Sequence, residues 1–483
     1  MIDLSPLKPA LQDKPILVVG LGKSGMPVFE ACTAAGIKTL LWDDNEASRK
    51  AAADKGATLQ DPATLDFTTI SLLCLSPGIP LTHPQPHPAV IKAQAAGIEV
   101  LGDIELFHRA KPKARTIGIT GTNGKSTTTA LIGHILKEAK VPSAVGGNIG
   151  EAVLTLPDLG DDGIYVIEMS SYQTDLSTTF APQISLLVNL SPDHLDRHGN
   201  MEGYIAAKER MFRGAGLAVI SLDDDGSVGV YERLKKQAQR KITAVSCERP
   251  LMHGVFVSEE GVLFDGKTKI ITLHTAKALK GKHNWQNAAM AYAACRDAGL
   301  DVESITKGMQ SFPGLIHRQN FVTAINGVAY INDSKATNDQ AAAMALRTFD
   351  PIYWIAGGKG KEGGYADCEK YLSHVRHAFL IGAAADEMAV WLEGKKVPFT
   401  RCGVLETAVA EAHALAQKDA AGKVDDEKRE KPVVLLAPAC ASLDQFKSFE
   451  HRGDVFVALV KKLIPENDSQ GKIPAKTATG GAA

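Results

Sequence analysis

One stretch of this chain restricts its fold more than any other. Residues 116–136 read TIGITGTNGKSTTTALIGHIL, which is a β-branched run, a glycine loop, and a segment whose apolar residues share one helical face. A loop between a buried strand and a helix directs free N–H groups and the positive helix end at a phosphate. The stretch therefore predicts a nucleotide-binding loop within a parallel α/β sheet.

The loop departs from the general phosphate-binding template at one position. The template G-x-x-x-x-G-K-[ST] requires glycine at position 119, where this chain has Ile119. The rest of the loop suits phosphate chemistry, because Lys125 can reach terminal phosphates and Ser126 or Thr127 can bind Mg²⁺. The alternative is a glycine loop with a surface lysine. We expect nucleotide phosphates at Gly121, Thr122, Asn123, Gly124, Lys125, Ser126 and Thr127.

Strand-like and helix-like segments alternate along the chain and predict an α/β protein with three domains. The 483 residues are too many for one ordinary core. A basic, proline-containing break at residues 107–115 and the stretch SFPGLIHRQN, which begins at Ser311, separate three such sets. We expect an N-terminal Rossmann-like parallel sheet (1–111), a central P-loop ATPase-type α/β domain (112–315), a C-terminal Rossmann-like α/β domain (316–466) and a disordered tail (467–483) with few apolar residues.

The composition argues against several classes of partner. The formal net charge is −2, which provides no field for gathering nucleic acid or acidic lipid. No apolar run approaches the ~20 residues needed to cross a bilayer, and the start MIDLSPLKPA lacks the pattern of an export signal. Seven cysteines are scattered without a C-x-x-C pair, as in proteins of a reducing compartment. We therefore expect a cytoplasmic protein that binds no nucleic acid and does not insert into a membrane.

The segment GLGKSG, residues 20–25, follows the first predicted strand and precedes a helix. Gly20, Gly22 and Gly25 fit G-x-G-x-x-G, and Asp43 follows at the end of the next strand. Such glycines let the backbone approach a pyrophosphate at a helix N-terminus. The segment predicts a nucleotide phosphate without saying which nucleotide, and a tight turn whose glycines serve packing is the alternative. An NAD(P)-dependent oxidoreductase is therefore one hypothesis for this chain.

A phosphate loop needs an acidic partner for its metal ion on a neighbouring strand. Glu168 ends the run IYVIE and is the natural candidate, although strand ends often carry a carboxylate without this role. His194 lies in the loop SPDHLDRH after the next strand. It could bind a second cation, or it could serve only as a hydrogen-bonding loop residue.

Lys208 stands inside an apolar helical stripe. The stripe consists of Met201, Tyr204, Ile205, Met211 and Phe212. Such a lysine usually extends its ammonium group to water along the apolar surface. A buried lysine loses its charge more easily and becomes a nucleophilic amine, which can add CO₂ to form an anionic carbamate. The spacing alone leaves both interpretations open.

Polar residues also follow other predicted strands and helix starts. Asn284 and Asn287 in HNWQNA stand at a helix start, where capping is the ordinary role. Arg318 lies at the second domain junction, where an arginine could reach a phosphate. The runs YINDSKATN and APACASLDQFKSFEHRG follow strands of the third domain, and open parallel sheets bind ligands at the carboxyl ends of their strands. Ordinary polar loops are the alternative for both runs.

Taken in order, these motifs resemble the Mur ligase family of ATP-dependent amino-acid-adding enzymes. The resemblance covers about residues 14–460, and it explains Ile119, because the family loop reads T-G-T-[NK]-G-K-[ST] without the first glycine. Within the family, NDSKATN and APACASLDQF resemble the members that add D-glutamate to UDP-N-acetylmuramoyl-L-alanine, with Ala437 in place of a serine. The D-N-P-R run expected of diaminopimelate-adding members is absent.

The resemblance implies a set of site residues. Nucleotide-sugar contacts would be Lys23, Ser24, Asp43, Asp44, Ser76, Pro77, Gly78, Asn148 and Gln173. ATP contacts would be the loop residues 121–127 with Asn284, Asn287, Arg318 and Asp333. Metal ligands would be Ser126, Glu168, His194 and Lys208 as a carbamate, and the catalytic residues would be Lys125, Lys208 and His194. D-glutamate contacts would be Lys335, Thr337, Lys361, Ser442 and Phe449.

Two positions depart from the family pattern or leave it ambiguous. Asn45 stands where relatives often have arginine, and Lys359 competes with Lys361 in GGKGKEGGY.

The implied reaction is the ATP-dependent ligation of D-glutamate to UDP-N-acetylmuramoyl-L-alanine through an acyl phosphate, in peptidoglycan precursor synthesis. It implies ATP and Mg²⁺, with two metal sites, and we expect a monomer. The alternatives are the NAD(P)-dependent oxidoreductase and a non-enzymatic assembly protein that uses ATP as a switch. The phosphate loop, Glu168 and Lys208 together disfavour the oxidoreductase.

Overall fold

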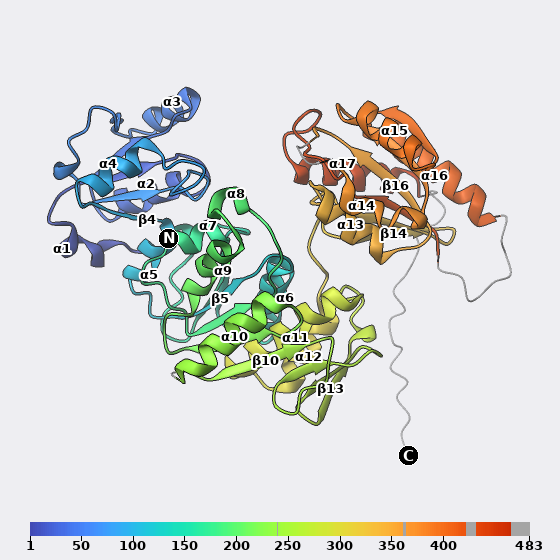
Figure 1. Ribbon diagram of the computed structural model, residues 1–483, viewed down its shortest axis with the longest axis horizontal. Helices are drawn as coiled ribbons and strands as arrows, with labels where there is room; N and C mark the ends of the chain where they lie inside the picture. The colour runs from blue at the N-terminus through green and yellow to red at the C-terminus, as the bar shows by residue number, and fades with distance from the viewer. Residues whose placement is uncertain (239, 361–363, 422–430, 465–483) are drawn as a thin grey trace, which may run out of the picture. The chain divides into compact units, whose positions relative to one another are not determined.

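The computed structural model describes residues 1–238, 240–360, 364–421 and 431–464. Its contacts divide the chain into two compact units, Met1–Pro313 and Gly314–Ala483, and each is described by itself. The first unit holds two β-sheets and the second unit holds one (Figure 1). The predicted α/β fold with three sheet domains is therefore confirmed, while Lys361 and the expected tail 467–483 lie outside the described residues.

The first sheet is parallel and has the order β2-β1-β3-β4. Every residue of its strands β1 and β3 is buried, which a parallel strand requires because both of its faces are covered. Helix α2 packs on one face and helix α4 on the other. The elements are β1 (Ile16–Val19), α2 (Gly25–Ala34), β2 (Thr39–Trp42), α3 (Glu46–Asp54), β3 (Leu72–Leu75), α4 (Pro88–Ala95), β4 (Glu99–Leu101) and α5 (Asp103–Arg109), after a short α1 (Lys8–Leu11).

The second sheet has nine strands in the order β13-β12-β11-β10-β9-β8-β5-β7-β6. Its pairs are parallel from β6 to β11, and β12 and β13 extend it as antiparallel strands. The strands are β5 (Arg115–Thr120), β6 (Ser143–Gly147), β7 (Ile164–Glu168), β8 (Ile184–Leu187), β9 (Leu217–Ser221), β10 (Ile242–Ser246), β11 (Val255–Val257), β12 (Val262–Asp265) and β13 (Thr268–Thr272).

Two groups of helices accompany this sheet. Helices α6 and α11 pack on one face and share a core with α12, while α9 and α10 contribute to the core of the other face. The helices are α6 (Lys125–Glu138), α7 (Ser171–Asp175), α8 (Leu195–His198), α9 (Met201–Glu209), α10 (Asp225–Gln237), α11 (Lys282–Asp297) and α12 (Val302–Ser311). The stripe predicted to run from Met201 to Phe212 is not one α-helix, because α9 tightens into a 3₁₀ turn over Arg210–Phe212.

The second unit holds a six-stranded sheet in the order β14-β15-β19-β16-β17-β18. Strand β14 is antiparallel to β15, and the remaining pairs are parallel. Helices α13, α14 and α15 cover one face, and α16 and α17 cover the other. The elements are β14 (Asn320–Ile325), β15 (Val328–Asn332), α13 (Asp339–Thr348), β16 (Ile352–Gly357), α14 (Ala366–Glu369), β17 (Val375–Ile381), α15 (Ala385–Gly394), β18 (Phe399–Gly403), α16 (Leu405–Ala421), β19 (Val433–Leu436) and α17 (Phe449–Lys462).

Within the described ranges, no helix has the length and apolar character that crossing a membrane requires.

Candidate functional site

The phosphate loop lies at the carboxyl end of β5, where the chain order reverses between neighbouring strands. Strand β5 pairs with β7 on one side and β8 on the other. Ile119 is fully buried in β5, where it is in register with Glu168 and Leu186. Position 119 is therefore part of the strand, and the loop begins two residues later. This explains physically why the first glycine of the general template is not needed here.

Gly124 is the loop position at which a side chain fits least. Its φ is +79°, a left-handed conformation that L side chains rarely adopt. A Cβ at this position would lie 2.2 Å from Oδ1 of Asn287. Helix α6 begins at the next residue, so its N-terminal N–H groups face the loop.

Two lysines donate to one carbonyl oxygen of this loop. Nζ of Lys125 lies 2.9 Å from the oxygen of Gly121 and 2.7 Å from that of Thr122. Nζ of Lys208 lies 2.8 Å from the same oxygen of Gly121. Lys208 is 2 % exposed, so the interpretation in which its ammonium group extends to water is wrong. Burial holds the pKa of Lys208 well below its ordinary value, and the nearby charge of Lys125 lowers it further.

Glu168 ends β7 as a buried carboxylate that is only half satisfied. Its Oε1 accepts a hydrogen bond from Nδ2 of Asn148 at 2.7 Å, and its backbone carbonyl accepts one from the N–H of Asn148 at 2.9 Å. Oε2 has no hydrogen-bond partner among the described residues. A buried carboxylate oxygen that nothing donates to is costly, and a divalent cation would satisfy it.

His194 stands half-exposed in the loop after β8, with a φ of +53°. Its Nε2 lies 3.4 Å from Oδ2 of Asp193, and its ring centroid lies 4.9 Å from that of Tyr172. Burial lowers the pKa of His194, with Lys208 and Lys125 acting in the same direction and Asp193 opposing them. The neutral imidazole that this favours is the form that binds metal ions.

A cavity of about 530 Å³ brings Lys125, His194 and Lys208 together with the glycine turn of the first sheet, whereas the expected metal ligands Glu168 and Ser126 are not among its wall residues. Its wall also includes the small residues Gly20 and Gly22. Other expected contacts in the wall are Lys23, Ser24, Asp43, Ser76, Pro77, Gly78, Asn148 and Gln173. Asp44 is not part of the wall, and its carboxylate is near His87 and the indole of Trp42.

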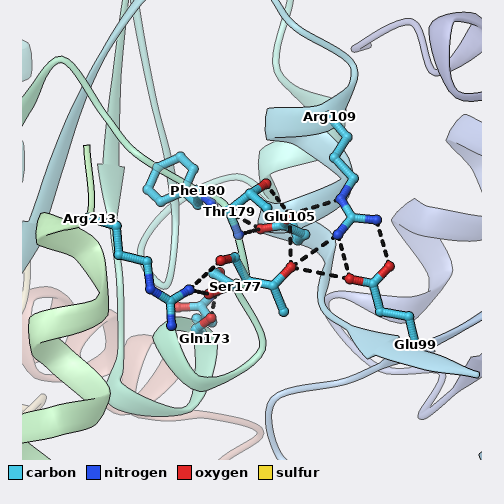
Figure 2. Close-up of polar contacts among 9 residues, drawn as sticks. Glu99, Glu105, Arg109, Gln173, Ser177, Thr179, Phe180 and Arg213 are labelled. Carbon is cyan, nitrogen blue, oxygen red and sulfur yellow. Dashed lines mark hydrogen bonds and ion pairs between the residues drawn. The ribbon is translucent and has the colours of Figure 1, made fainter. Parts of the chain in front are cut away.

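Gln173 is held in place by hydrogen bonds at both ends of the short helix α7. Its side-chain oxygen accepts from the N–H of Ser170 at 3.1 Å in a capping box, so its amide nitrogen is the group that can face a ligand. Its backbone carbonyl accepts from Oγ of Ser177, and Nη1 of Arg213 donates to the carbonyl of Ser177 at 3.1 Å (Figure 2).

The segment after α7 is tied to helix α5 of the first sheet by a buried carboxylate. Glu105 is fully buried and accepts from the N–H groups of Thr179 at 2.9 Å and Phe180 at 3.1 Å, while Nε of Arg109 donates to it at 2.8 Å (Figure 2). Burial would raise the pKa of Glu105, but the hydrogen bonds from Thr179 and Arg109 outweigh it and lower the pKa. The carboxylate of Glu105 therefore ties the segment after α7 to α5.

Asn284 and Asn287 do not cap helix α11, so the capping interpretation is wrong. The N-cap is Gly281, which makes no side-chain cap hydrogen bond. Nδ2 of Asn287 donates to Oδ1 of Asn284 at 3.2 Å, and Oγ1 of Thr128 donates to Oδ1 of Asn287 at 3.3 Å. Asn287 thus connects α11 to the helix that follows the phosphate loop.

Two residues that the sequence analysis did not select also hold the phosphate loop. Oδ1 of Asn189 accepts from the N–H of Asn123 at 2.8 Å, and Nδ2 of Asn189 donates to Oε1 of Gln286 at 3.1 Å. Nε2 of Gln286 donates in turn to Oγ of Ser221 at 2.8 Å. The sequence offered two signals for these residues. Asn189 ends a strand-like run, and Gln286 lies between Asn284 and Asn287, which the sequence had already indicated.

The second unit gathers its own selected residues at the carboxyl ends of β15 and β19. Asp333 is 4 % exposed, and its N–H donates to the carbonyl of Leu436 at 2.8 Å. Burial raises the pKa of Asp333 to about 7, against the opposing charge of Arg318. Lys335 Nζ lies 5.9 Å from the ring centroid of Phe449. These two residues come from the two loops that were predicted to bind one ligand.

A buried arginine that the sequence analysis did not select joins these loops. Arg452 is fully buried, and it donates to Oγ of Ser334 at 3.0 Å and to the carbonyls of Ser334 at 2.9 Å and Cys440 at 3.2 Å. Burial lowers the pKa of Arg452 to about 10. Of the remaining selected residues, Ser442 is buried and Thr337 donates its N–H to the carbonyl of Lys335. The backbone of Lys359 pairs with Ala441, and Lys361 lies outside the described residues.

Residues 119–295 match the family model of the Mur ligase middle domain. The chain is 48% identical over 456 residues to the UDP-N-acetylmuramoylalanine–D-glutamate ligase of Paramagnetospirillum magneticum, covering 94% of this chain and 97% of that protein. It is 47% identical over 465 residues to the ligase of the same name from a Caulobacter species, covering 94% and 97%.

Solved structures show the same fold at low sequence identity. The UDP-N-acetylmuramate-alanine ligase of Thermotoga maritima matches with a TM-score of 0.57 at 16% identity, over 93% of this chain and 99% of that one. MurF from Acinetobacter baumannii matches with a TM-score of 0.55 at 16% identity, over 95% and 98%.

Proposed function

The chain belongs to the Mur ligase family, and on that premise we propose that its residues carry out the activity for which its relatives are named. It is an ATP-dependent acid–amino-acid ligase that joins D-glutamate to UDP-N-acetylmuramoyl-L-alanine in the synthesis of peptidoglycan precursors. The observation that best supports this site assignment is the single cavity that joins the glycine turn after β1 to Lys125, His194 and Lys208.

The glycine turn of the first sheet binds the uridine diphosphate of the substrate rather than a nicotinamide dinucleotide. Both carboxylate oxygens of Asp43 already accept backbone hydrogen bonds, from Leu21 at 2.6 Å and Asn45 at 2.8 Å. These bonds favour a role for Asp43 in holding the glycine turn, rather than the ribose contact that is typical of dinucleotide enzymes. Residues 1–111 form the nucleotide-sugar domain, with Asn148 and the amide nitrogen of Gln173 reaching the remainder of the substrate from the opposite wall.

ATP binds at the loop 121–127, with its phosphates at the N-terminus of α6. Lys125 leaves the loop carbonyls and neutralises charge on the transferred phosphoryl group. Asn287 supports the loop at Gly124. Residues 112–315 are the ATP-binding domain, and Arg318 and Asp333 are further nucleotide contacts.

The donor set near the loop fits magnesium. Glu168 offers a buried oxygen without a partner, His194 offers a neutral imidazole, and Ser126 offers a hydroxyl at the loop. The described residues contain no group of three or more His, Cys, Asp or Glu side chains arranged for a metal ion. Lys208 supplies a further anionic ligand after its neutral amine adds CO₂, which forms an N–C bond and releases a proton. Two Mg²⁺ ions held by these residues would supply positive charge that offsets the charge of the phosphates.

The reaction needs activation because a carboxylate oxygen is a poor leaving group. The L-alanyl carboxylate attacks the γ-phosphorus of ATP in line, ADP leaves, and an acyl phosphate forms. The neutral amine of D-glutamate then attacks the acyl carbon and forms the C–N bond, the C–O bond to the phosphate breaks, and inorganic phosphate and the amine proton are released. D-glutamate is held within residues 316–466 by Lys335, Thr337, Ser442, Phe449 and either Lys359 or Lys361.

The protein works in the cytoplasm as a monomer, without nucleic-acid partners or membrane insertion. The seven scattered cysteines support the reducing compartment, and the net charge of −2 supports the lack of a nucleic-acid partner.

A panel of radiolabelled amino acids tests the substrate assignment directly. The protein is incubated with UDP-N-acetylmuramoyl-L-alanine, ATP and Mg²⁺, and label in the nucleotide-linked product is counted. D-glutamate should be incorporated, with L-glutamate and diaminopimelate as the comparison. Incorporation of another amino acid in preference to D-glutamate would contradict the proposal.

A further inference from the structure

Arg197, in the short segment after β8, holds a loop of the first sheet by three consecutive carbonyls. Its guanidinium nitrogens lie 3.4 Å from the oxygen of Pro77, 3.1 Å from that of Gly78 and 3.1 Å from that of Ile79. This loop follows β3 of the first sheet, whereas Arg197 lies in α8, between strands β8 and β9 of the second sheet. Arg197 itself is outside the cavity wall, but Pro77 and Gly78 are part of it.

The same guanidinium is stacked on the opposite wall of the cavity. Its Cζ lies 4.3 Å from the ring centroid of Tyr172. The Tyr172 ring lies 4.9 Å from the ring of His194, and both residues line the cavity. The stacking on the Tyr172 ring and the three hydrogen bonds together define one position for the guanidinium group.

The two sets of contacts connect the two walls through one planar group. The walls are the loop 77–79, beside the expected uridine diphosphate site, and the Tyr172–His194 pair, beside the phosphate loop. Arginine suits this role because its rigid fork carries several donors in one plane and leaves its face free for an aromatic ring. Lysine has a single charged point and cannot make both sets of contacts.

We propose that Arg197 is a positioning residue that sets the distance between the two walls of the cavity. The proposal rests on the function proposed above, because it concerns a substrate that spans both walls. A nucleotide alone touches the first-sheet wall, whereas a nucleotide linked to an acyl-bearing sugar reaches both. When the walls are held at one spacing, binding at the second wall becomes an intramolecular event with a high effective concentration. Arg197 therefore increases the preference for the complete substrate over its nucleotide part.

The test compares two ligands by calorimetric titration, UDP and UDP-N-acetylmuramoyl-L-alanine. For Arg197→Ala we expect the affinity for the complete substrate to fall about tenfold while the affinity for UDP changes less than twofold. Arg197→Lys should give an intermediate ratio. The KM for ATP should stay within about twofold, because the hydrogen bonds and the ring contact of Arg197 within the described part of the chain are with the loop 77–79 and Tyr172, outside the phosphate loop. A merely structural loss would weaken UDP and the complete substrate by the same factor.

A matched control is available in the same unit. Arg240 also lies near an aromatic ring, with Cζ 6.0 Å from the centroid of Phe212, and donates to the carbonyl of Phe212, but it is outside the cavity wall. Arg240→Ala should leave the ratio of the two affinities unchanged. Thermal unfolding midpoints establish that each variant folds. If Arg197→Ala does not fold, the two affinities are compared for Arg197→Lys instead.

A double-mutant cycle with Tyr172→Leu tests whether Arg197 acts through its contact with the Tyr172 ring or independently of that ring. In the Tyr172→Leu background, Arg197→Ala should change the affinity ratio less than in the wild-type protein. An unchanged ratio in both Arg197 variants, or an equal loss for both ligands, would overturn the inference. If the wild-type protein fails to bind UDP-N-acetylmuramoyl-L-alanine at all, the proposed function fails instead.

Discussion

Lys125 and Lys208 donate hydrogen bonds to the same carbonyl oxygen, that of Gly121, at 2.9 and 2.8 Å. Two ammonium groups at one acceptor repel each other, and burial of Lys208 makes its neutral form the less costly one. Lys125 can leave its two loop carbonyls for a phosphate. In the proposed function, Lys125 is the cation that binds phosphate and Lys208 is the amine that reacts with CO₂.

Replacement of Lys208 tests the carbamate. We expect Lys208→Ala to lower the rate of ligation by about 10²-fold or more, because one anionic ligand near the reacting phosphate is lost. Short-chain carboxylates added to the assay should restore part of the rate, whereas Lys208→Arg, which cannot form a carbamate, should stay inactive. Undiminished activity of Lys208→Ala would remove this role.

Glu168→Gln tests the metal site. The substitution preserves the shape of the side chain but removes the negative charge of its carboxylate, whose Oε2 has no hydrogen-bond partner among the described residues. We expect a rise of about tenfold or more in the Mg²⁺ concentration that gives half-maximal activity. The measurement is a Mg²⁺ titration at saturating substrates. An unchanged Mg²⁺ requirement would show that the carboxylate does not face the cation.

Gly124→Ala tests the contact between the phosphate loop and α11. The added Cβ would meet Oδ1 of Asn287 at 2.2 Å in a left-handed backbone conformation, so the loop must shift. We expect a rise of at least tenfold in the KM for ATP. Gly394→Ala is the control, because nothing lies within 4 Å of that position and its backbone is not left-handed. Equal ATP kinetics in the two variants would contradict the assignment.

Asp333 makes the stability of the second unit depend on pH. Burial raises its pKa from 3.8 to about 7, so the native state binds more protons than the unfolded state between these values. The contribution of Asp333 to stability is therefore fully present below pH 3.8 and is lost as the pH rises through about 7. Asp333→Asn should gain stability relative to the wild type between pH 5 and pH 8, by roughly 1–4 kcal/mol. Differential scanning calorimetry at pH 5 and pH 8 measures the stability of both proteins. A stability difference between Asp333→Asn and the wild type that is the same at both pH values would contradict the prediction.

Much of the fold and of the candidate site was predictable because the relevant signals are local. The strand–loop–helix pattern at 116–136 placed the phosphate loop, and the apolar stripe around Lys208 identified a lysine that is in fact buried. The buried position of Ile119 in β5 gives a physical reason for the missing glycine.

The residues that were missed depend on tertiary contacts. Arg197 and Arg452 each donate to carbonyls far away in sequence, and nothing in their immediate neighbours signals this. Asn284 and Asn287 were open to a capping interpretation because their spacing at a helix start suits a cap, and only the position of α11 relative to α6 distinguishes the two roles. The 3₁₀ turn at Arg210–Phe212 likewise preserves the apolar spacing while ending the α-helix.

Phosphate release with each substrate omitted in turn is the most direct test of the central claim. The protein is assayed with ATP and Mg²⁺ alone, with either UDP-N-acetylmuramoyl-L-alanine or D-glutamate added, and with both. We expect sustained phosphate release only when both are present, in equal amount to the ligated product. Release that proceeds at the same rate without either substrate would contradict the ligase assignment.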